Sequence, residues 1–388
     1  NIGNLRRIYA SLVAYCTLAS PHAHAGSFAD CTGANNVLGI TASHNGLCAE
    51  TNGERVECWL DNVCDSGDTQ NEAIAVKNAA AKWVIYVVCD GGAGAVACAV
   101  YEDTNLDRVG IALHGTANDD RLAFSTGVGG GTHQMDKLTG GQDLEGFLNG
   151  LGGHDILVGS NINNDAYVDI LAGGSGIDYL LGQAGKDKLY GGEDNDLVDG
   201  GTQADQVVEG NNGHDVVIGG NGDDPHVEGN AGNDFICGDA ATNLPSDIAT
   251  WNPTFPSGWT SDPNTWWGNV TTPLACSTSD AYDDVIRAGS GDDVVYSGAG
   301  GDDVTGGSGL DLIYLGLGAD RACDPGEDGD ELYGEGDNHD QLYATSPTSS
   351  FHALLDGGGQ GSDRCSAATT GLSVQNCTGT PLGYTCPF

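Results

Sequence analysis

An apolar residue follows an aspartate by two positions again and again along this chain, and glycine-rich stretches separate the pairs. Side chains of a strand alternate between its two faces, so this pattern predicts very short strands with only the middle side chain turned inward. Glycine adopts the positive φ angles of a tight turn at low cost, so each glycine-rich stretch predicts a turn. The pattern therefore predicts an all-β coil with two repeats per turn and one core residue per repeat.

The repeat is regular in two blocks and degenerate elsewhere. The first regular block covers 173–238 and the second 281–343, with intervals of nine or ten residues between aspartates. Copies between 107 and 172 are weaker, and a last copy at 358–365 has Cys365 at the apolar position. The predicted core residues are Leu180, Leu189, Val198, Val207, Val217, Ile236, Ile286, Val295, Val304, Ile313, Ala322, Leu332 and Leu342, with His226 as an exception.

The charge balance narrows the classes of function. Lys and Arg number 13 against 55 Asp and Glu, which gives a formal net charge of −42. A nucleic-acid partner is not expected, because phosphate binding needs a basic face. A chain this acidic with 63 glycines resists compaction, and a disordered acidic polymer is one interpretation. The fixed register of the apolar residues argues against disorder, except in the absence of metal.

The repeat resembles the RTX (repeat-in-toxin) nonapeptide G-G-x-G-x-D-x-U-x, over roughly residues 115–365. The resemblance implies a right-handed parallel β-roll, or β-solenoid, with calcium in the turns. Many proteins of this type are secreted toxins, proteases, lipases, adhesins or surface-layer proteins, and the roll itself is not catalytic in them. This chain departs from the type in its many cysteines and in an apparent N-terminal signal.

The stacking of the aspartates points to calcium. With two repeats per turn, Asp178 lies over Asp196, and Asp187 over Asp205, at the strand spacing of about 4.8 Å. Like charges so close repel, and Ca²⁺, which takes about six to eight oxygen ligands, reverses the sign. Mg²⁺ demands a tighter octahedron and fits irregular turns less well. The predicted calcium ligands are Asp155, Asp169, Asp178, Asp187, Asp196, Asp205, Asp215, Asp224, Asp234, Asp284, Asp293, Asp302, Asp311, Asp320, Asp330 and Asp340.

Three histidines directly precede repeat aspartates: His154, His214 and His339. A histidine–metal site is one interpretation. Exposed histidines without a metal are the other, and the resemblance favours it, because this position faces solvent in proteins of the RTX type.

The cysteines and the N-terminus indicate an oxidising compartment. Thirteen cysteines without zinc-type spacing suit disulfides. Arg6 and Arg7 precede an apolar run over 8–19 and a small-x-small sequence at 23–25, which resembles a secretory signal peptide. Its removal takes away Cys16 and leaves twelve cysteines. No other run approaches a membrane helix in length, so we expect a secreted or cell-surface protein whose mature chain does not span a membrane.

The N-terminal region differs from the repeats. It is predicted to form a disulfide-bonded cap with a helical pattern at 71–83, a strand at 84–89 and a strand at 95–102. Cys89 and Cys98 are placed to join the two strands. A binding domain displayed by the coil is the alternative to a cap.

A segment without repeats separates the two regular blocks and holds four tryptophans. Cys237 and Cys276 flank it and are placed to tie its base. The segment either projects and offers its tryptophans to sugars or a partner, or folds back against the coil. The predicted domains are a signal peptide (1–25), an N-terminal cap (26–106), a first roll block (107–238), an insertion (239–280), a second roll block (281–365) and a C-terminal disulfide cap (366–388).

Two classes of function remain after a search for catalytic motifs. HExxH and G-x-S-x-G are missing from the sequence, and metal sites account for the carboxylates, so no enzyme is expected. One class is a calcium-stabilised structural component of a cell surface or extracellular matrix, self-assembling into a polymer or layer. The other is a calcium-dependent adhesin or carbohydrate-binding module that uses the tryptophan-rich segment or the N-terminal cap.

Folding of 107–365 and calcium binding are predicted to be one event, because the stacked carboxylates repel without metal. Excess chelator should abolish the β-type circular dichroism signal, and added calcium should restore it. A β spectrum that survives excess chelator would contradict this prediction.

Overall fold

The computed structural model describes residues 48–51, 55–60, 70–77, 83–90, 96–102, 110–125, 144–160, 167–242, 275–278, 281–324, 330–335, 339–344, 354–358, 363–367 and 373–377. These residues form strands and turns, and none belongs to a helix long and apolar enough to cross a membrane. They group into two compact units, Asn1–Ile162 and Asn163–Phe388, each treated by itself below. The predicted signal peptide lies outside the described residues.

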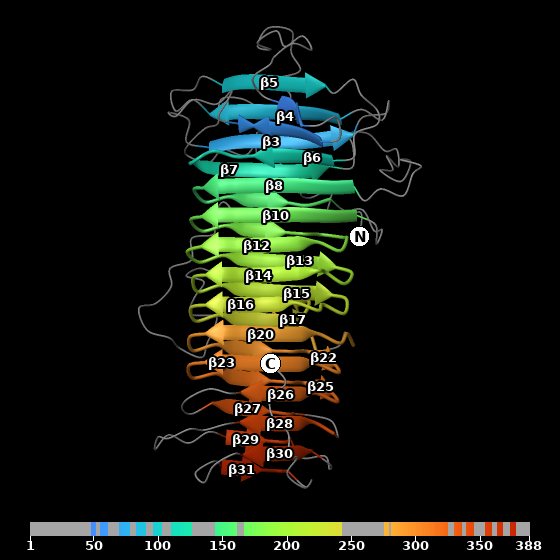
Figure 1. Cartoon of the computed structure of the whole chain (residues 1–388), viewed down its shortest axis with the longest axis vertical. Coiled ribbons are helices and arrows are strands. Elements are labelled where there is room, and N and C mark those ends of the chain that lie inside the picture. The colour runs from blue at the N-terminus through green and yellow to red at the C-terminus, as the bar shows by residue number, and fades with distance from the viewer. Residues whose placement is uncertain are drawn as a thin grey trace. The chain divides into compact units, whose positions relative to one another are not determined.

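The unit Asn163–Phe388 is a parallel β-solenoid built from two sheets, which confirms the predicted fold class. Figure 1 shows its strands stacked along the chain from β10 to β31. Sheet 1 contains β10 (Tyr167–Ser175), β12 (Lys188–Glu193), β14 (Val207–Asn212), β16 (Val227–Ala231), β20 (Val285–Ser290), β23 (Asp303–Ser308), β26 (Arg321–Asp324), β28 (Gln341–Ala344) and β30 (Arg364–Ala367). Sheet 2 contains β11 (Tyr179–Leu181), β13 (Leu197–Thr202), β15 (Val216–Asn221), β17 (Phe235–Asp239), β21 (Val294–Tyr296), β24 (Leu312–Tyr314), β27 (Glu331–Tyr333), β29 (Leu354–Asp356) and β31 (Ser373–Gln375).

Successive repeats alternate between the two sheets, so two repeats make one turn, as predicted. Leu180 on β11 pairs in register with Val198 on β13, and Leu189 on β12 pairs with Val208 on β14. Each interior position therefore stacks on the equivalent position of the next turn. The core is a double column of fully buried apolar side chains between the sheets.

Two predicted core positions are wrong, and both lie in ten-residue repeats. The interior residue after Asp205 is Val208 rather than Val207, and after Asp224 it is Val227 rather than His226. The extra residue of each repeat lies directly after the aspartate, and a shift of one residue moves a side chain to the opposite face of a strand. Val207 and His226 are consequently only partly buried.

Sheet 2 buries more than one apolar residue per repeat, which corrects the expectation of a single core residue. On β15, Val216 and Ile218 flank the interior Val217, and all three are at most 2% exposed. On β17 the same holds for Phe235 and Cys237 around the interior Ile236. Adjacent residues of a strand point to opposite faces, so both faces of sheet 2 are buried at these strands.

The insertion between the regular blocks is closed at its base, as predicted. Cys237 forms a disulfide with Cys276. The short strands β18 (Ala241–Thr242) and β19 (Ala275–Cys276) pair antiparallel beside it. The next turn then continues the stack, because β16 pairs with β20 and β17 with β21. All four tryptophans of the insertion lie outside the described residues.

Two smaller strands complete the described part of this unit. β22 (Ala299–Gly300) and β25 (Leu317–Gly318) pair parallel in the turns that follow β21 and β24. The turns in this part of the solenoid therefore stack by backbone hydrogen bonds as the strands do.

The unit Asn1–Ile162 combines parallel and antiparallel strand pairs. One group, in the order β1-β2-β6-β8, contains β1 (Cys48–Thr51), β2 (Arg55–Trp59), β6 (Gly110–His114) and β8 (Leu144–Gly152). The other, in the order β9-β7-β3-β4-β5, contains β3 (Gln70–Lys77), β4 (Trp83–Asp90), β5 (Val96–Glu102), β7 (Asp119–Ser125) and β9 (Ile156–Val158). The pairs β2–β6 and β3–β7 are parallel, so strands from the predicted cap take part in the same kind of pairing as the repeats. The domain limits given above stay a prediction.

The helical pattern predicted for 71–83 is wrong, because Gln70–Lys77 forms strand β3. β3 pairs antiparallel with the next strand, β4, and parallel with β7, more than forty residues later, and this tertiary pairing overrides a weak local helical preference. The two strands predicted after it are confirmed as β4 and β5, which form an antiparallel hairpin. In this hairpin Cys89 lies opposite Ala97, and Cys98 lies opposite Val88, so the two cysteines are offset by one position in the register. A Cys89–Cys98 disulfide stays a prediction.

The turn glycines give a direct test of this packing. Gly232 has a φ of +134°, and a β-carbon there would overlap the carbonyl oxygen of Gly213 in the neighbouring turn. Gly232→Ala should therefore lower the thermal midpoint of the calcium-loaded protein by several degrees. The matched control is Gly301→Ala, where the nearest atom to a new β-carbon is the flexible Asp283 side chain at 3.3 Å. Equal thermal midpoints for the two variants would refute this account of the turns.

Candidate metal centre

All sixteen predicted ligands are buried aspartates, each at most 4% exposed. Asp169 lies inside strand β10, and each of the others precedes a strand with at most two residues in between, where a turn ends. Asp155 belongs to the unit Asn1–Ile162, and the other fifteen belong to Asn163–Phe388. Burial of so many carboxylates in one short motif indicates a cation site or a proton site at each turn.

Within Asn163–Phe388 the aspartates form two continuous hydrogen-bonded ladders. Asp196 shows the pattern: its Oδ1 accepts the backbone N–H of Asp178 at 2.8 Å, and its own N–H donates to Oδ1 of Asp215 at 2.8 Å. One ladder contains Asp178, Asp196, Asp215, Asp234, Asp293, Asp311 and Asp330. The other contains Asp169, Asp187, Asp205, Asp224, Asp284, Asp302, Asp320, Asp340 and Asp363.

The second carboxylate oxygen has a different environment from the first. Among the described residues no hydrogen-bond donor reaches the buried Oδ2 atoms of Asp187, Asp196, Asp205, Asp215, Asp224, Asp234, Asp284, Asp293, Asp311 and Asp320. A buried acceptor without a donor costs free energy. Repeated at turn after turn, this cost indicates that something other than a hydrogen bond satisfies these oxygens.

Backbone carbonyl groups converge on the same oxygens. A β-carbon placed on Gly191 would lie 2.5 Å from Oδ2 of Asp196 and 2.5 Å from the carbonyl oxygen of Gly210. At Gly173 and at Gly200, a β-carbon would likewise lie close to both Oδ2 of the repeat aspartate and a carbonyl oxygen of the next turn. The two oxygens are close neighbours because the glycine has no side chain. Each turn therefore presents carboxylate and carbonyl oxygens together, which is the donor set that hard cations prefer.

Without metal, the surroundings of the ladder aspartates disfavour the negatively charged form of their carboxyl groups. Burial and then the neighbouring carboxylates Asp215 and Asp178 raise the pKa of Asp196 to about 10. Burial, with the charges of Asp187 and Asp224, likewise raises the pKa of Asp205 to about 10. The backbone N–H bonded to each Oδ1 lowers the pKa but does not overcome burial. Without a cation, burial and the neighbouring charges therefore favour the protonated form of these two carboxyl groups at neutral pH.

Comparison with known proteins identifies the repeat. The family model for the RTX calcium-binding nonapeptide repeat matches four times, at residues 172–207, 201–236, 209–244 and 278–304. The chain carries RTX repeats. A search of curated proteins and a search of solved structures gave no match. The RTX ladder geometry extends beyond the matched residues, since Asp311, Asp320 and Asp340 make the same aspartate-to-backbone bonds.

Calcium fits the donor set of these RTX turns. RTX nonapeptide repeats bind calcium. The buried groups that converge in these turns are carboxylate and carbonyl oxygens, which a calcium ion accepts in irregular geometry. An ion at the Oδ2 atoms would neutralise the stacked charges that raise the aspartate pKa values.

Three further buried aspartates take part in hydrogen bonds of the turns. Asp120 donates its backbone N–H to Oδ1 of Asp155 at 2.7 Å, and its sequence context, GTANDDRLA, matches the repeat. Asp239 is fully buried, with Oδ2 accepting the N–H of Ala299 at 2.8 Å. It occupies the place of a turn glycine, in register with Gly220, so the repeat pattern gives no signal for it.

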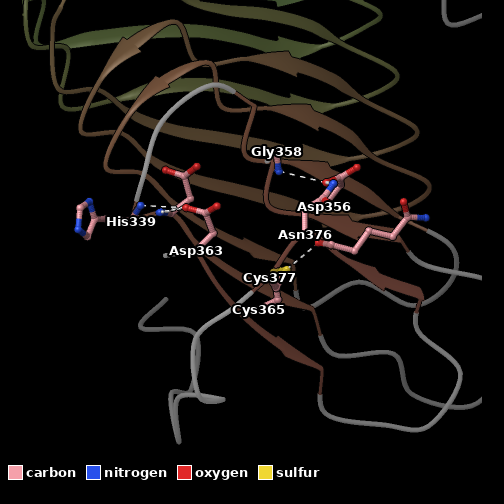
Figure 2. Close-up of a disulfide and its surroundings, with 9 residues drawn as sticks. His339, Asp356, Gly358, Asp363, Cys365, Asn376 and Cys377 are labelled. Atoms are coloured by element: carbon pink, nitrogen blue, oxygen red, sulfur yellow. Dashed lines mark hydrogen bonds between the residues drawn. A yellow bond between two sulfur atoms is a disulfide. The ribbon is translucent and has the colours of Figure 1, made fainter. Parts of the chain in front are cut away.

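Asp363 ends the second ladder near the C-terminal disulfide (Figure 2). Its Oδ1 accepts the backbone N–H groups of His339 at 2.9 Å and Asp340 at 3.2 Å. Cys365, two residues later, takes the interior position opposite Leu342 and forms a disulfide with Cys377. Asp363 is in the last copy of the repeat, so the sequence pattern does contain the signal for it.

The three histidines that precede repeat aspartates are exposed. His214 accepts the backbone N–H of Asn233 through Nδ1 at 2.7 Å, and its own N–H donates to Oδ1 of Asn195 at 2.7 Å. This position therefore forms an outer ladder of side-chain acceptors beside the aspartates. For His214, a hydrogen-bonding role in the turn accounts for the residue without a metal.

A pair of substitutions in one turn tests whether a ladder aspartate contributes more to calcium binding than a nearby acidic residue outside the ladder. Asp196→Asn keeps the Oδ1 acceptor but removes the charge and one carboxylate oxygen, so it should raise the calcium concentration needed for half-maximal folding severalfold. Asp194→Asn, two residues earlier and exposed, removes the same charge outside the ladder and should change this midpoint little. Calcium titrations followed by circular dichroism compare them, and equal midpoints would argue against the ladder as the metal centre.

Acid should stabilise the metal-free protein. The folded-state pKa of Asp187 is raised to about 9, from an ordinary value of 3.8. Such a group contributes stability below the ordinary pKa and loses it as the pH rises through the folded-state pKa. Lowering the pH from 7 to 5 without metal should therefore increase the β-type circular dichroism signal. With limiting calcium the same change should weaken calcium binding, because protons compete for the carboxylates. Loss of β signal on acidification of the metal-free chain would contradict the assignment.

Proposed function

We propose that this RTX β-roll protein is secreted and serves as a non-enzymatic structural component of a cell surface or extracellular matrix. In this proposal calcium binds along both aspartate ladders and at Asp155, with the sixteen predicted aspartates as ligands. The observation that carries the proposal is the row of buried Oδ2 atoms without hydrogen-bond donors. Asp120, Asp239 and Asp363 join the same ligand groups through their position in the turns.

The disulfides support a secreted location. Cys237–Cys276 and Cys365–Cys377 are disulfides that form and persist in oxidising compartments. Calcium-dependent folding fits the same setting, because extracellular modules bind calcium with dissociation constants of about 10⁻⁴–10⁻³ M. A chain of this kind stays unfolded where calcium is scarce and folds where calcium is abundant.

The placement of the carboxylates supports a non-enzymatic role. The ladder aspartates are buried, and their Oδ1 atoms accept backbone N–H groups in every turn. A carboxylate that acts as a general acid or base must reach its substrate. These carboxylates face the turns of the solenoid itself, so they hold the scaffold together.

The proposed self-association would take place at the end of the solenoid that contains β30 and β31. Among the described residues, β30 and β31 pair with a neighbouring strand on one side only. A strand with a free edge is a template for a further strand from another molecule. Head-to-tail stacking through this end would extend both sheets and build a polymer.

Sedimentation velocity and electron microscopy at rising protein concentration, with calcium and after its removal, test this function. We expect polymers or sheets in calcium that dissociate when chelator is added. Monodisperse particles at every concentration would overturn the structural role. A glycan array, with and without residues 245–275, would then test the adhesin alternative, for which the described residues provide no observation.

A further inference from the structure

The outer face of sheet 1 carries a column of polar side chains, three of them ionisable as Glu or Arg, that does not belong to the aspartate ladders. Tyr190, Glu209, Glu228 and Arg287 occupy equivalent positions on β12, β14, β16 and β20. Glu209 and Glu228 are direct cross-strand neighbours, and like charges in this arrangement destabilise a sheet. Something must offset the repulsion between them.

His226 lies between the two glutamates. Its Nε2 atom is 3.1 Å from Oε1 of Glu209 and 3.2 Å from Oε1 of Glu228. The extra residue of its ten-residue repeat gives it this position, because the interior place goes to Val227 and His226 turns outward. One ligand atom from each of the three residues can be chosen so that all lie within 4.8 Å of one another.

We propose that Glu209, His226 and Glu228 bind a transition-metal dication such as Zn²⁺, as a site separate from the calcium turns. Zinc bonds of about 2.0–2.2 Å in a tetrahedron place the donor atoms about 3.3–3.6 Å apart. The two nitrogen–oxygen distances, 3.1 and 3.2 Å, are close to that spacing. Imidazole nitrogen selects zinc and its neighbours in the transition series, whereas calcium takes oxygen ligands.

Neighbouring groups hold the two carboxylates in place. Asn211 donates from Nδ2 to Oε2 of Glu209 at 2.8 Å, which leaves Oε1 facing His226. Arg287 donates from Nη1 at 3.0 Å to Oε1 of Glu228, the same oxygen that lies 3.2 Å from His226, so this oxygen would contact both the guanidinium and the metal. Such supporting hydrogen bonds orient metal ligands. With neutral His226, the two glutamates and Arg287 sum to one negative charge, which favours a dication.

The site is accessible from solvent. The exposed fractions of the side chains are 35% for His226, 19% for Glu209 and 17% for Glu228. Three protein ligands leave a fourth tetrahedral position for water or for a ligand from another molecule. The metal would also bond β14 to β16, which come from successive turns of the solenoid.

Zinc titration of the calcium-saturated full chain by calorimetry tests the proposal, with Co²⁺ as a spectroscopic probe of tetrahedral coordination. We expect one zinc site whose affinity falls at least tenfold in His226→Gln and in Glu209→Gln. The control is His154→Gln, an exposed histidine in the other unit, which should leave this site unchanged. Circular dichroism in calcium confirms that each variant is folded.

Two results would overturn the proposal. One is the absence of zinc binding to the calcium-saturated protein, which would leave His226 as a hydrogen-bonding bridge between the glutamates. The other is zinc binding that both variants retain, which would place the metal at other residues of this chain with its 10 histidines. Because Glu209→Gln changes no histidine, it keeps the test decisive if His226→Gln does not fold.

Discussion

Burial of stacked carboxylates is the constraint on which the solenoid depends. Each ladder aspartate uses Oδ1 to hold the backbone of the preceding turn, and this fixes the carboxylate inside the protein. Oδ2 is then buried as well, beside carbonyl oxygens of the next turn. The turn glycines and much of the acidic character of the repeats follow from this arrangement. A neutral acceptor in place of the aspartate would keep the backbone bond but would bind calcium poorly.

The stacking tolerates a long insertion because each turn bonds only to its neighbours. Asp224 bonds to Asp284 across sixty positions with the same atoms that elsewhere join residues eighteen or nineteen apart. The disulfide Cys237–Cys276 and the β18–β19 pair close the base of the insertion beside the ladder. Residues can therefore be added at the turn without a change in the register of the sheets.

The outer faces of the two sheets differ in chemistry. On sheet 2 the rings of Tyr296 and Tyr314 stack with centroids 4.8 Å apart, and those of Tyr314 and Tyr333 stack at 5.0 Å. These distances follow the spacing of strands in a sheet, so the parallel register itself aligns the rings. On sheet 1 the same register aligns two glutamates, and the repulsion between them is the reason that His226 and Arg287 matter there.

Much of the fold could be predicted from the periodicity of the repeats. An aspartate at every ninth or tenth residue with an apolar partner specifies strand, turn and stacking together, because each repeat contacts only its neighbours. The ladder order from Asp178 to Asp234 follows from the rule of two repeats per turn, and Asp120 and Asp363 were within reach of the same pattern. The strand at 70–77 could not be predicted from its local pattern, because its parallel pairing with β7 involves residues distant in the sequence.

Tertiary structure decided the positions where the repeat length changes. The sequence shows that a repeat has ten residues but not where the extra residue lies, and that placement moves Val208 and Val227 inward and His226 outward. Asp239 joins the turns only because β17 and β15 are in register, which puts it where other turns have glycine. The sequence by itself determined a coil of RTX repeats with stacked aspartates, since charge and spacing are local properties. The structure decided which side chains meet on its surface, since that depends on the register between turns.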